Sequence, residues 1–173
     1  MGKTALFTSG GKESRLAYEL SKNKYNIDYF ITIIENGTVQ YHRTIPNPKN
    51  YLIDVTGLSN NPSEWHKDID KVVETLKELK VNTIIVGNIH PIPEVLKTTM
   101  DKEEIEIISP LLNWDRKQIL QEILDRGLKA KIVSTFNWKN DEMLGKIIDE
   151  DFIKSDLGID LCGENGEYHT EIQ

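Results

Sequence analysis

The residues best suited to chemistry stand close together near the start of the chain, in the segment Thr8-Ser9-Gly10-Gly11-Lys12-Glu13-Ser14. An apolar run, Thr4 to Phe7, comes before this segment, and a helix-like run, Arg15 to Lys22, follows it. A strand that enters a glycine-rich turn and then a helix leaves backbone N–H groups unpaired at one point, where the helix dipole also favours negative charge. The segment therefore predicts a binding site for an anion such as phosphate.

The side chains of this loop suit the same ligand. Gly10 and Gly11 are expected to let the backbone bend with positive φ and to let a ligand approach without a Cβ in the way. Ser9 and Ser14 can each give a hydroxyl to phosphate oxygens, and Lys12 is expected to add a mobile positive charge. The spacing excludes a Walker P-loop and a dinucleotide-binding Gly-x-Gly-x-x-Gly motif. The alternative is a strand–turn–helix corner in which Ser9 simply caps the helix.

A second stretch rich in reactive groups runs from Gly158 to Thr170. It holds three glycines, three acidic residues, a thiol and an imidazole, with few apolar residues to place in a core. A loop of this composition is more easily explained by a ligand than by packing. Glu164 and Glu167 could accept protons, bind a cation that also touches phosphate, or hold an incoming amine. The alternative is a solvated, glycine-rich end of the chain.

Helix-type segments alternate along the chain with short runs rich in Ile and Val, which is typical of βαβ units. Strands are expected at Thr4 to Thr8, Tyr29 to Ile34, Tyr51 to Val55, Thr83 to Val86, Ile105 to Ile108 and Lys131 to Thr135. Helices are expected at Glu13 to Lys22, Glu64 to Leu79 (with Ser63 as its N-cap), Asp115 to Arg126 and Asp149 to Leu157. The sequence predicts one α/β domain over residues 1–173, a doubly wound, mainly parallel sheet with helices on both faces.

Ligands of such sheets gather at the carboxyl ends of the strands, near the point where the strand order reverses. Three segments are expected at this edge because each follows a predicted strand: the Ser9 loop, Gly87-Asn88-Ile89-His90 and Ser109-Pro110-Leu111. Turn residues between Glu35 and Asn50 predict a long connection there.

Composition narrows the class of protein. The 173 residues carry a net charge of −7 with no block of Lys or Arg, which argues against tight binding of nucleic acid by this chain. No segment approaches the ~20 apolar residues that span a bilayer, and no secretory segment precedes the first strand. A cytoplasmic protein without membrane contact is therefore expected. The single Cys162 excludes an internal disulfide and is better explained as a buried side chain than as a sulfur carrier.

The first loop resembles the pyrophosphate-binding loop of the N-type ATP pyrophosphatases (the PP-loop superfamily), Ser-Gly-Gly-x-Asp-Ser, with Glu13 at the position of the Asp. The run Gly163-Glu164-Asn165-Gly166-Glu167-Tyr168-His169-Thr170 resembles the Gly-Glu-x-Gly-Glu-(Tyr/Phe)-His/Glu-Thr signature of the diphthine–ammonia ligase family within that superfamily. Further segments similar to this family are Ser109 to Arg116, Gly127 to Val133 and Met143 to Asp149. The resemblance implies an adenine nucleotide alpha hydrolase-like fold.

The same resemblance implies an ATP-dependent, amide-forming ligase. In such enzymes a substrate carboxylate attacks the α-phosphorus of ATP and pyrophosphate leaves; ammonia then displaces AMP from the acyl-adenylate. The implied cofactors are ATP and Mg²⁺, and the implied partners are ammonia or ammonium and a carboxylate acceptor such as a modified protein side chain. No metal ligand is assigned from the sequence.

The resemblance also assigns residues to these steps. Nucleotide binding is expected at Thr8, Ser9, Gly10, Gly11, Lys12, Glu13, Ser14, Gly87 and Asn88. The acceptor or ammonia is expected at Gly163, Glu164, Asn165, Glu167 and His169. The expected catalytic residues are Lys12, Glu164 and Glu167.

Two other functions stay open on the sequence. One is an adenylating enzyme that modifies transfer RNA, although the acidity and the lack of a cysteine pair argue against it. The other is a nucleotide-binding regulatory module without turnover, because Glu13 and Asn88 depart from the residues usual in the family. Members of the family usually continue beyond the equivalent of Thr170. Part of the acceptor pocket is therefore expected either to be missing or to be supplied by another subunit, for example by a second copy of the chain in a homo-oligomer.

Overall fold

A computed structural model of the chain describes residues 2–35, 50–55, 66–135, 142–156, 158–164 and 167–173. The predicted connection between Glu35 and Asn50, the N-cap Ser63 and the substrate residue Asn165 lie outside the described residues. Among the described residues, no helix is both long enough and apolar enough to cross a membrane.

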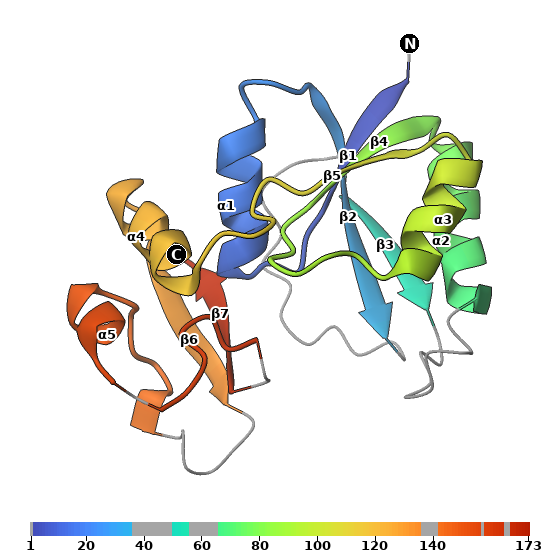
Figure 1. The fold of residues 1–173 in the computed structure, drawn as a ribbon. Coiled ribbons are helices and arrows are strands. Elements are labelled where there is room, and N and C mark those ends of the chain that lie inside the picture. Colours follow the sequence, from blue (N-terminus) through green and yellow to red (C-terminus); the bar gives the residue numbers. More distant parts are fainter. Residues whose placement is uncertain (1, 36–49, 56–65, 136–141, 157, 165–166) are drawn as a thin grey trace.

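The first part of the chain forms a parallel sheet covered on both faces (Figure 1). Its strand order, in the described residues, is β3-β2-β1-β4-β5, and all four neighbouring pairs run parallel. The elements are β1 (Lys3–Phe7), α1 (Lys12–Ser21), β2 (Ile27–Glu35), β3 (Asn50–Val55), α2 (His66–Glu78), β4 (Val81–Val86), α3 (Glu94–Lys102) and β5 (Glu106–Ile108). Helix α1 lies on one face and helices α2 and α3 lie on the other. The predicted α/β fold with helices on both faces is confirmed.

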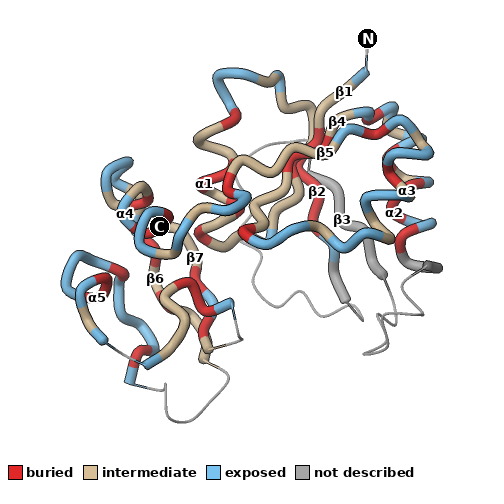
Figure 2. Tube along the Cα trace, in the orientation of Figure 1, coloured by how far each residue is buried: buried red, intermediate tan, exposed pale blue. Residues whose placement is uncertain are grey.

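The central strand β1 explains why both faces must be covered. Its neighbouring residues Ala5 and Leu6 point to opposite faces of the sheet, and both are fully buried. Figure 2 shows buried residues in the central strands of the sheet, between α1 on one side and α2 and α3 on the other. Ala5 packs in the cluster formed with α2 and α3, whereas Leu6 packs with Ala17 of α1. A strand that is apolar on both sides is typical of a buried parallel sheet.

The second part of the chain forms a smaller layer beside α1. Its elements are α4 (Arg116–Asp125), β6 (Ala130–Thr135), α5 (Glu150–Lys154) and β7 (Tyr168–Ile172). In the described residues, β6 and β7 pair antiparallel as a separate two-stranded sheet. The strand at Lys131 to Thr135 was predicted correctly, but its placement in the parallel sheet is wrong. Its partner β7 was not predicted, because Tyr168 to Thr170 were attributed to a loop.

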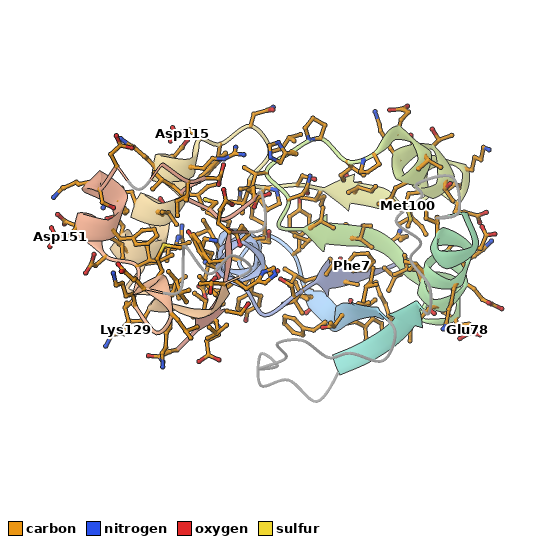
Figure 3. The ribbon with its side chains drawn as sticks, turned by 90° about the horizontal axis from the view of Figure 1, so that it is seen from below. Phe7, Glu78, Met100, Asp115, Lys129 and Asp151 are labelled. Carbon is orange, nitrogen blue, oxygen red and sulfur yellow. The ribbon has the colours of Figure 1, made fainter. Side chains whose placement is uncertain are left out.

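Helix α1 joins the two parts. Leu16 packs in the cluster formed by α4, α5, β6 and β7, while the adjacent Ala17 faces the parallel sheet. Figure 3 shows the arrangement from below, with Phe7 of β1 between Met100 of α3 on one side and Asp151 of α5 on the other. The N-terminus of α1 is therefore set between the parallel sheet and the C-terminal layer.

Helix ends follow local side-chain chemistry. Asp115 accepts a hydrogen bond from the Gln118 N–H (2.9 Å) and Asp149 from the Phe152 N–H (2.8 Å), so each caps the helix that the sequence predicted after it. Helix α5 is shorter than predicted because the backbone turns extended at Ser155. Helix α3 was not predicted, and it is anchored by the fully buried Met100.

Candidate active site

A cavity of about 420 Å³ opens at the carboxyl ends of β1 and β4. The chain passes from β1 to β2 on one side and later returns to β4 on the other, so these two strands flank the point where the strand order reverses. The apolar lining of the cavity includes Phe7, Ile84, Val86, Leu96 and Ile107. The polar lining is formed by Ser9, Glu13, Ser14, Asn88, His90 and Glu164.

Short hydroxyl side chains hold the loop that precedes α1. The Gly10 N–H donates to Thr8 Oγ1 at 3.1 Å and the Gly11 N–H to Ser9 Oγ at 3.4 Å. The Ser9 N–H donates to Ser14 Oγ at 3.1 Å, and the two serine hydroxyls lie 3.1 Å apart. These are neutral bonds, which an anion can replace with stronger charge-assisted ones. The backbone N–H groups that the sequence predicts to be unpaired thus have hydroxyl partners in this structure, and they remain gathered at the start of α1.

The two glycines of the loop differ. Gly10 has a φ of 81°, the left-handed conformation that the sequence predicts. Gly11 is the N-cap of α1 with φ −77° and ψ 173°, so the prediction of a positive φ at this residue is wrong. The nearest atom to a Cβ on Gly11 would be Ser9 Oγ at 3.4 Å.

Lys12 is not the mobile cation that the sequence predicts. Its side chain is only 2% exposed, and its Nζ donates to the Cys162 carbonyl oxygen at 2.7 Å and lies 2.5 Å from Glu13 Oε1. The same Nζ stands 5.0 Å from the centre of the Tyr168 ring. A buried ammonium needs such partners, because leaving water without them is costly. Lys12 does not line the cavity.

The two ends of the chain meet at α1. Besides the Lys12 ammonium, the Lys12 backbone N–H donates to Thr170 Oγ1 of β7 at 3.3 Å. Glu164 lines the same cavity as Ser9, Glu13 and Ser14. The first loop and the C-terminal stretch therefore border the same cavity.

Asp160 organises the loop that carries Glu164. Its Oδ1 accepts the backbone N–H of Cys162 (2.8 Å) and of Glu164 (3.4 Å), and its Oδ2 accepts Arg116 Nε (3.0 Å). Burial alone would raise the pKa of Asp160, but the hydrogen bonds from Cys162 and Arg116 outweigh it and lower that pKa. Asp160 is thus a charged acceptor around which residues 160–164 turn.

Arg116 connects this loop to the segment after β4. Its NH2 group lies 2.9 Å from His90 Nε2, and His90 Nε2 lies 3.9 Å from Glu164 Oε2.

Burial, followed by the negative charge of Glu13, raises the pKa of the Glu164 carboxyl group above its ordinary value. A carboxylate with a raised pKa beside a cavity is suited to take and release a proton.

The other described residues that were predicted in the C-terminal stretch, Gly163, Glu167 and His169, are not part of the cavity lining. Glu167 Oε1 accepts the Asp160 backbone N–H at 3.1 Å, and this bond supports the loop of residues 160–164. Gly163 has a φ of 73° and a Cβ there would lie 2.6 Å from the Tyr168 carbonyl oxygen, so this glycine serves the turn. Burial, followed by the charge of Lys12, lowers the pKa of the His169 imidazole.

After β4, Gly87 and Asn88 reach the cavity in different ways. A Cβ on Gly87 would lie 2.8 Å from the carbonyl carbon and oxygen of Glu13, so only glycine lets the two backbones pass this closely. Asn88 Nδ2 donates to the His90 carbonyl oxygen, while its Oδ1 is buried and has no hydrogen-bond partner among the described residues. Ser109 to Leu111, also expected at this edge, are not part of the cavity lining.

Sequence reasoning missed the residues that position Glu164. In the sequence, Asp160 is one acidic residue among several, and Arg116 is part of a segment similar to the diphthine–ammonia ligase family. Their signal was weak, since the two residues stand 44 positions apart and nothing in their spacing predicts an ion pair.

Family models divide the chain close to the boundary between its two parts. Residues 2–105 match the diphthamide synthase N-terminal domain, and residues 115–172 match the diphthamide synthase C-terminal domain. The chain belongs to the diphthamide synthase family. The predicted resemblance to the diphthine–ammonia ligases is therefore confirmed at the level of the family. A comparison with curated proteins gives no match.

The cavity of this diphthamide synthase family member draws on both matched regions. Ser9, Glu13, Ser14 and Asn88 come from the N-terminal region, and Glu164 comes from the C-terminal one. Membership of the family supports a diphthine–ammonia ligase-like function and an ATP-using ligase.

Proposed function

We propose that this protein is a ligase that uses ATP to activate a carboxylate as an acyl-adenylate and then transfers ammonia to it, forming an amide. The observation that carries the proposal is the single cavity that joins the anion-binding loop to Glu164. This cavity offers both donors for phosphate and a carboxylate with a raised pKa.

The nucleotide would lie with its base toward the apolar strands and its phosphates toward the start of α1. Phe7, Val86 and Ile107 provide apolar surface for a purine ring. The loop from Thr8 to Ser14 provides backbone N–H groups and hydroxyls at a helix N-terminus, where negative charge is favoured. Donors held in advance around the departing pyrophosphate stabilise the charge that grows there in the transition state.

Mg²⁺ suits the phosphate end of the cavity. This ion is usually held by one or two carboxylates together with phosphate oxygens, and Glu13, at the start of α1, is a carboxylate of the cavity lining. Glu13 Oε1 is buried and pairs with Lys12 Nζ at 2.5 Å, so the ion would meet this carboxylate through its other oxygen. When bound, the ion would neutralise part of the triphosphate charge. No cluster of three or more His, Cys, Asp or Glu in the described chain forms a metal site by itself, so the ion would arrive with the nucleotide.

Glu164 would act on the incoming nitrogen. Ammonium must lose a proton before its nitrogen can attack the acyl carbon, and a carboxylate in the cavity can accept that proton. Nitrogen then forms the new C–N bond, and the C–O bond to AMP breaks with its electron pair leaving on the phosphate oxygen. Arg116, fixed by Asp160, supplies positive charge near the negative acceptor and AMP.

The acceptor is proposed to be a carboxylate on a protein side chain, and diphthine is the candidate that the family suggests. The test uses α-labelled ATP, magnesium and ammonium with three kinds of acceptor: a protein that carries diphthine, free carboxylic acids, and transfer RNA. The expected products with the first are AMP, pyrophosphate and an amide. Glu164→Gln is expected to keep ATP binding and to lose amide formation, because only the proton acceptor has changed.

Other products would separate the alternatives. Release of ADP would reject the adenylation mechanism. Turnover with transfer RNA alone would favour an RNA-modifying enzyme, and tight ATP binding without turnover on any acceptor would favour a regulatory module. Loss of ATP binding in Glu164→Gln would contradict the proposal that the first loop binds the nucleotide while Glu164 acts on the incoming nitrogen.

A further inference from the structure

Lys12 is the fifth residue of the segment Thr8 to Ser14, the loop proposed to bind phosphate, yet its side chain points into the protein. Its Nζ contacts the Cys162 carbonyl oxygen, Glu13 Oε1 and the Tyr168 ring, and only 2% of the residue is exposed. Two of these three contacts are made with the C-terminal stretch, 150 or more residues further along the chain. The superfamily pattern that the loop resembles leaves this position open, so a loop of this kind can bind phosphate without a lysine there.

The contact with Cys162 lies at the centre of the turn that carries Glu164. The Cys162 N–H donates to Asp160 Oδ1, and the Gly163 N–H donates to the Asp160 carbonyl oxygen at 3.0 Å. The Cys162 carbonyl oxygen, on the other side of the same residue, accepts from Lys12. The turn is therefore hydrogen-bonded to Asp160 through the N–H groups of Cys162 and Gly163, and to Lys12 of α1 through the carbonyl oxygen of Cys162.

We propose that Lys12 is a positioning residue: its buried ammonium fastens residues 160–164 to the start of α1 and so places Glu164 beside the cavity, and it is not a phosphate ligand. The role of Glu164 rests on the proposed function, whereas the contact by which Lys12 holds residues 160–164 against α1 does not. The charge of Lys12 also acts on Glu164, since it opposes the rise in the pKa of that carboxyl group. Both effects are lost when the ammonium is removed.

The first test replaces the ammonium by an apolar group of similar length, Lys12→Met, with Lys22→Met as the matched control. Lys22 lies at the other end of α1, where it pairs with Glu19. In Lys12→Met, amide hydrogen exchange of residues 160–164 is expected to accelerate at least ~10-fold, because local opening becomes easier. The dissociation constant for magnesium ATP is expected to change less than about threefold. Lys22→Met is expected to change neither quantity.

A merely structural role would not move the pH dependence of the reaction. Because the positive charge of Lys12 favours ionised Glu164, Lys12→Met is expected to shift the acid limb of the rate profile to higher pH. Lys12→Arg, which restores the charge, is expected to return the limb toward its wild-type position. An unshifted limb in Lys12→Met would contradict an action on Glu164.

A second measurement needs no substitution. If Lys12 bound phosphate, it would have to leave Cys162 when ATP binds, and exchange of residues 160–164 in the wild-type chain would accelerate at saturating ATP. If Lys12 stays bound to Cys162, amide exchange of residues 160–164 is expected to stay constant or to slow at saturating ATP. Accelerated exchange with ATP, or a loss of ATP affinity of more than about tenfold in Lys12→Met with unchanged exchange, would overturn the proposal. If the wild-type chain bound no ATP, the proposed function would be wrong. Amide exchange of residues 160–164 in Lys12→Met, measured without nucleotide, would still show whether Lys12 holds this segment in place.

Discussion

A Cβ atom on Gly87 would lie 2.8 Å from the carbonyl carbon of Glu13, which places the segment after β4 in direct contact with the first turn of α1. Both partners of this contact are backbone, so neither can rotate away as a flexible side chain would. The contact sets the distance between the loop from Thr8 to Ser14 and the rest of the cavity. It therefore links the packing of the parallel sheet to the shape of the site.

Gly87→Ala is expected to destabilise the protein by about 1–3 kcal/mol, the usual cost of overpacking, and to weaken ATP binding because α1 must shift. Urea unfolding and a binding titration measure the two effects. Gly11→Ala is the stability control, since its φ is ordinary and a Cβ there meets nothing closer than 3.4 Å. A loss of stability in Gly11→Ala as large as in Gly87→Ala would show that the Gly87 contact is not decisive.

Asp160→Ala is expected to lower stability by about 2 kcal/mol, because it removes a charged acceptor used by Arg116 and by two backbone N–H groups. For a chain of this length the loss corresponds to a fall of roughly 4–8 °C in Tm, which differential scanning calorimetry can measure. Glu122→Ala removes an exposed pair with Arg126 on α4 and is expected to cost less than about 1 kcal/mol. Equal losses in the two variants would contradict a special role for Asp160.

The carboxyl group of Glu164 is expected to give stability a measurable pH dependence. Its pKa is raised by burial and by Glu13, so the folded chain keeps a proton that the unfolded chain releases near its ordinary pKa of about 4.3. Stability from this group is therefore lost as pH rises from that value through the folded pKa. Glu164→Gln cannot release the proton, so its stability relative to wild type should increase over this window. Urea unfolding at a series of pH values tests the trend, and a constant or falling difference would contradict it.

The thiol of Cys162 is expected to be unreactive in the folded protein. Cys162 is 3% exposed, and burial raises the pKa of its thiol to about 12. Because the thiolate is the reactive form, alkylation by iodoacetamide at pH 8 should be at least ~100-fold slower in the folded chain than in urea. Glutathione in the same two solutions controls for the solvent. A fast reaction of the folded chain would restore sulfur transfer as a candidate chemistry.

The local parts of the structure were predictable because their causes are local. The strand, glycine turn and helix from Thr4 to Lys22 follow from the order of apolar, glycine and helix-forming residues, and Asp115 and Asp149 cap helices three residues from their hydrogen-bond partners. The buried stripe of α2, Ile69, Val72, Val73 and Leu76, follows from helical periodicity. The parallel sheet follows from the alternation of such units.

The tertiary structure decided what depends on contacts between distant segments. The pairing of β6 with β7, the burial of Lys12 against Cys162 and the ion pair of Arg116 with Asp160 join residues 33 or more positions apart, and no local pattern encodes which partner each will find. The sequence alone determined that a glycine- and serine-rich loop opens α1 and that an acidic glycine-rich stretch lies near the end of the chain. Only the fold decided that Glu164 reaches the cavity while Lys12 turns into the core, because a buried ammonium must take the partners that packing brings to it.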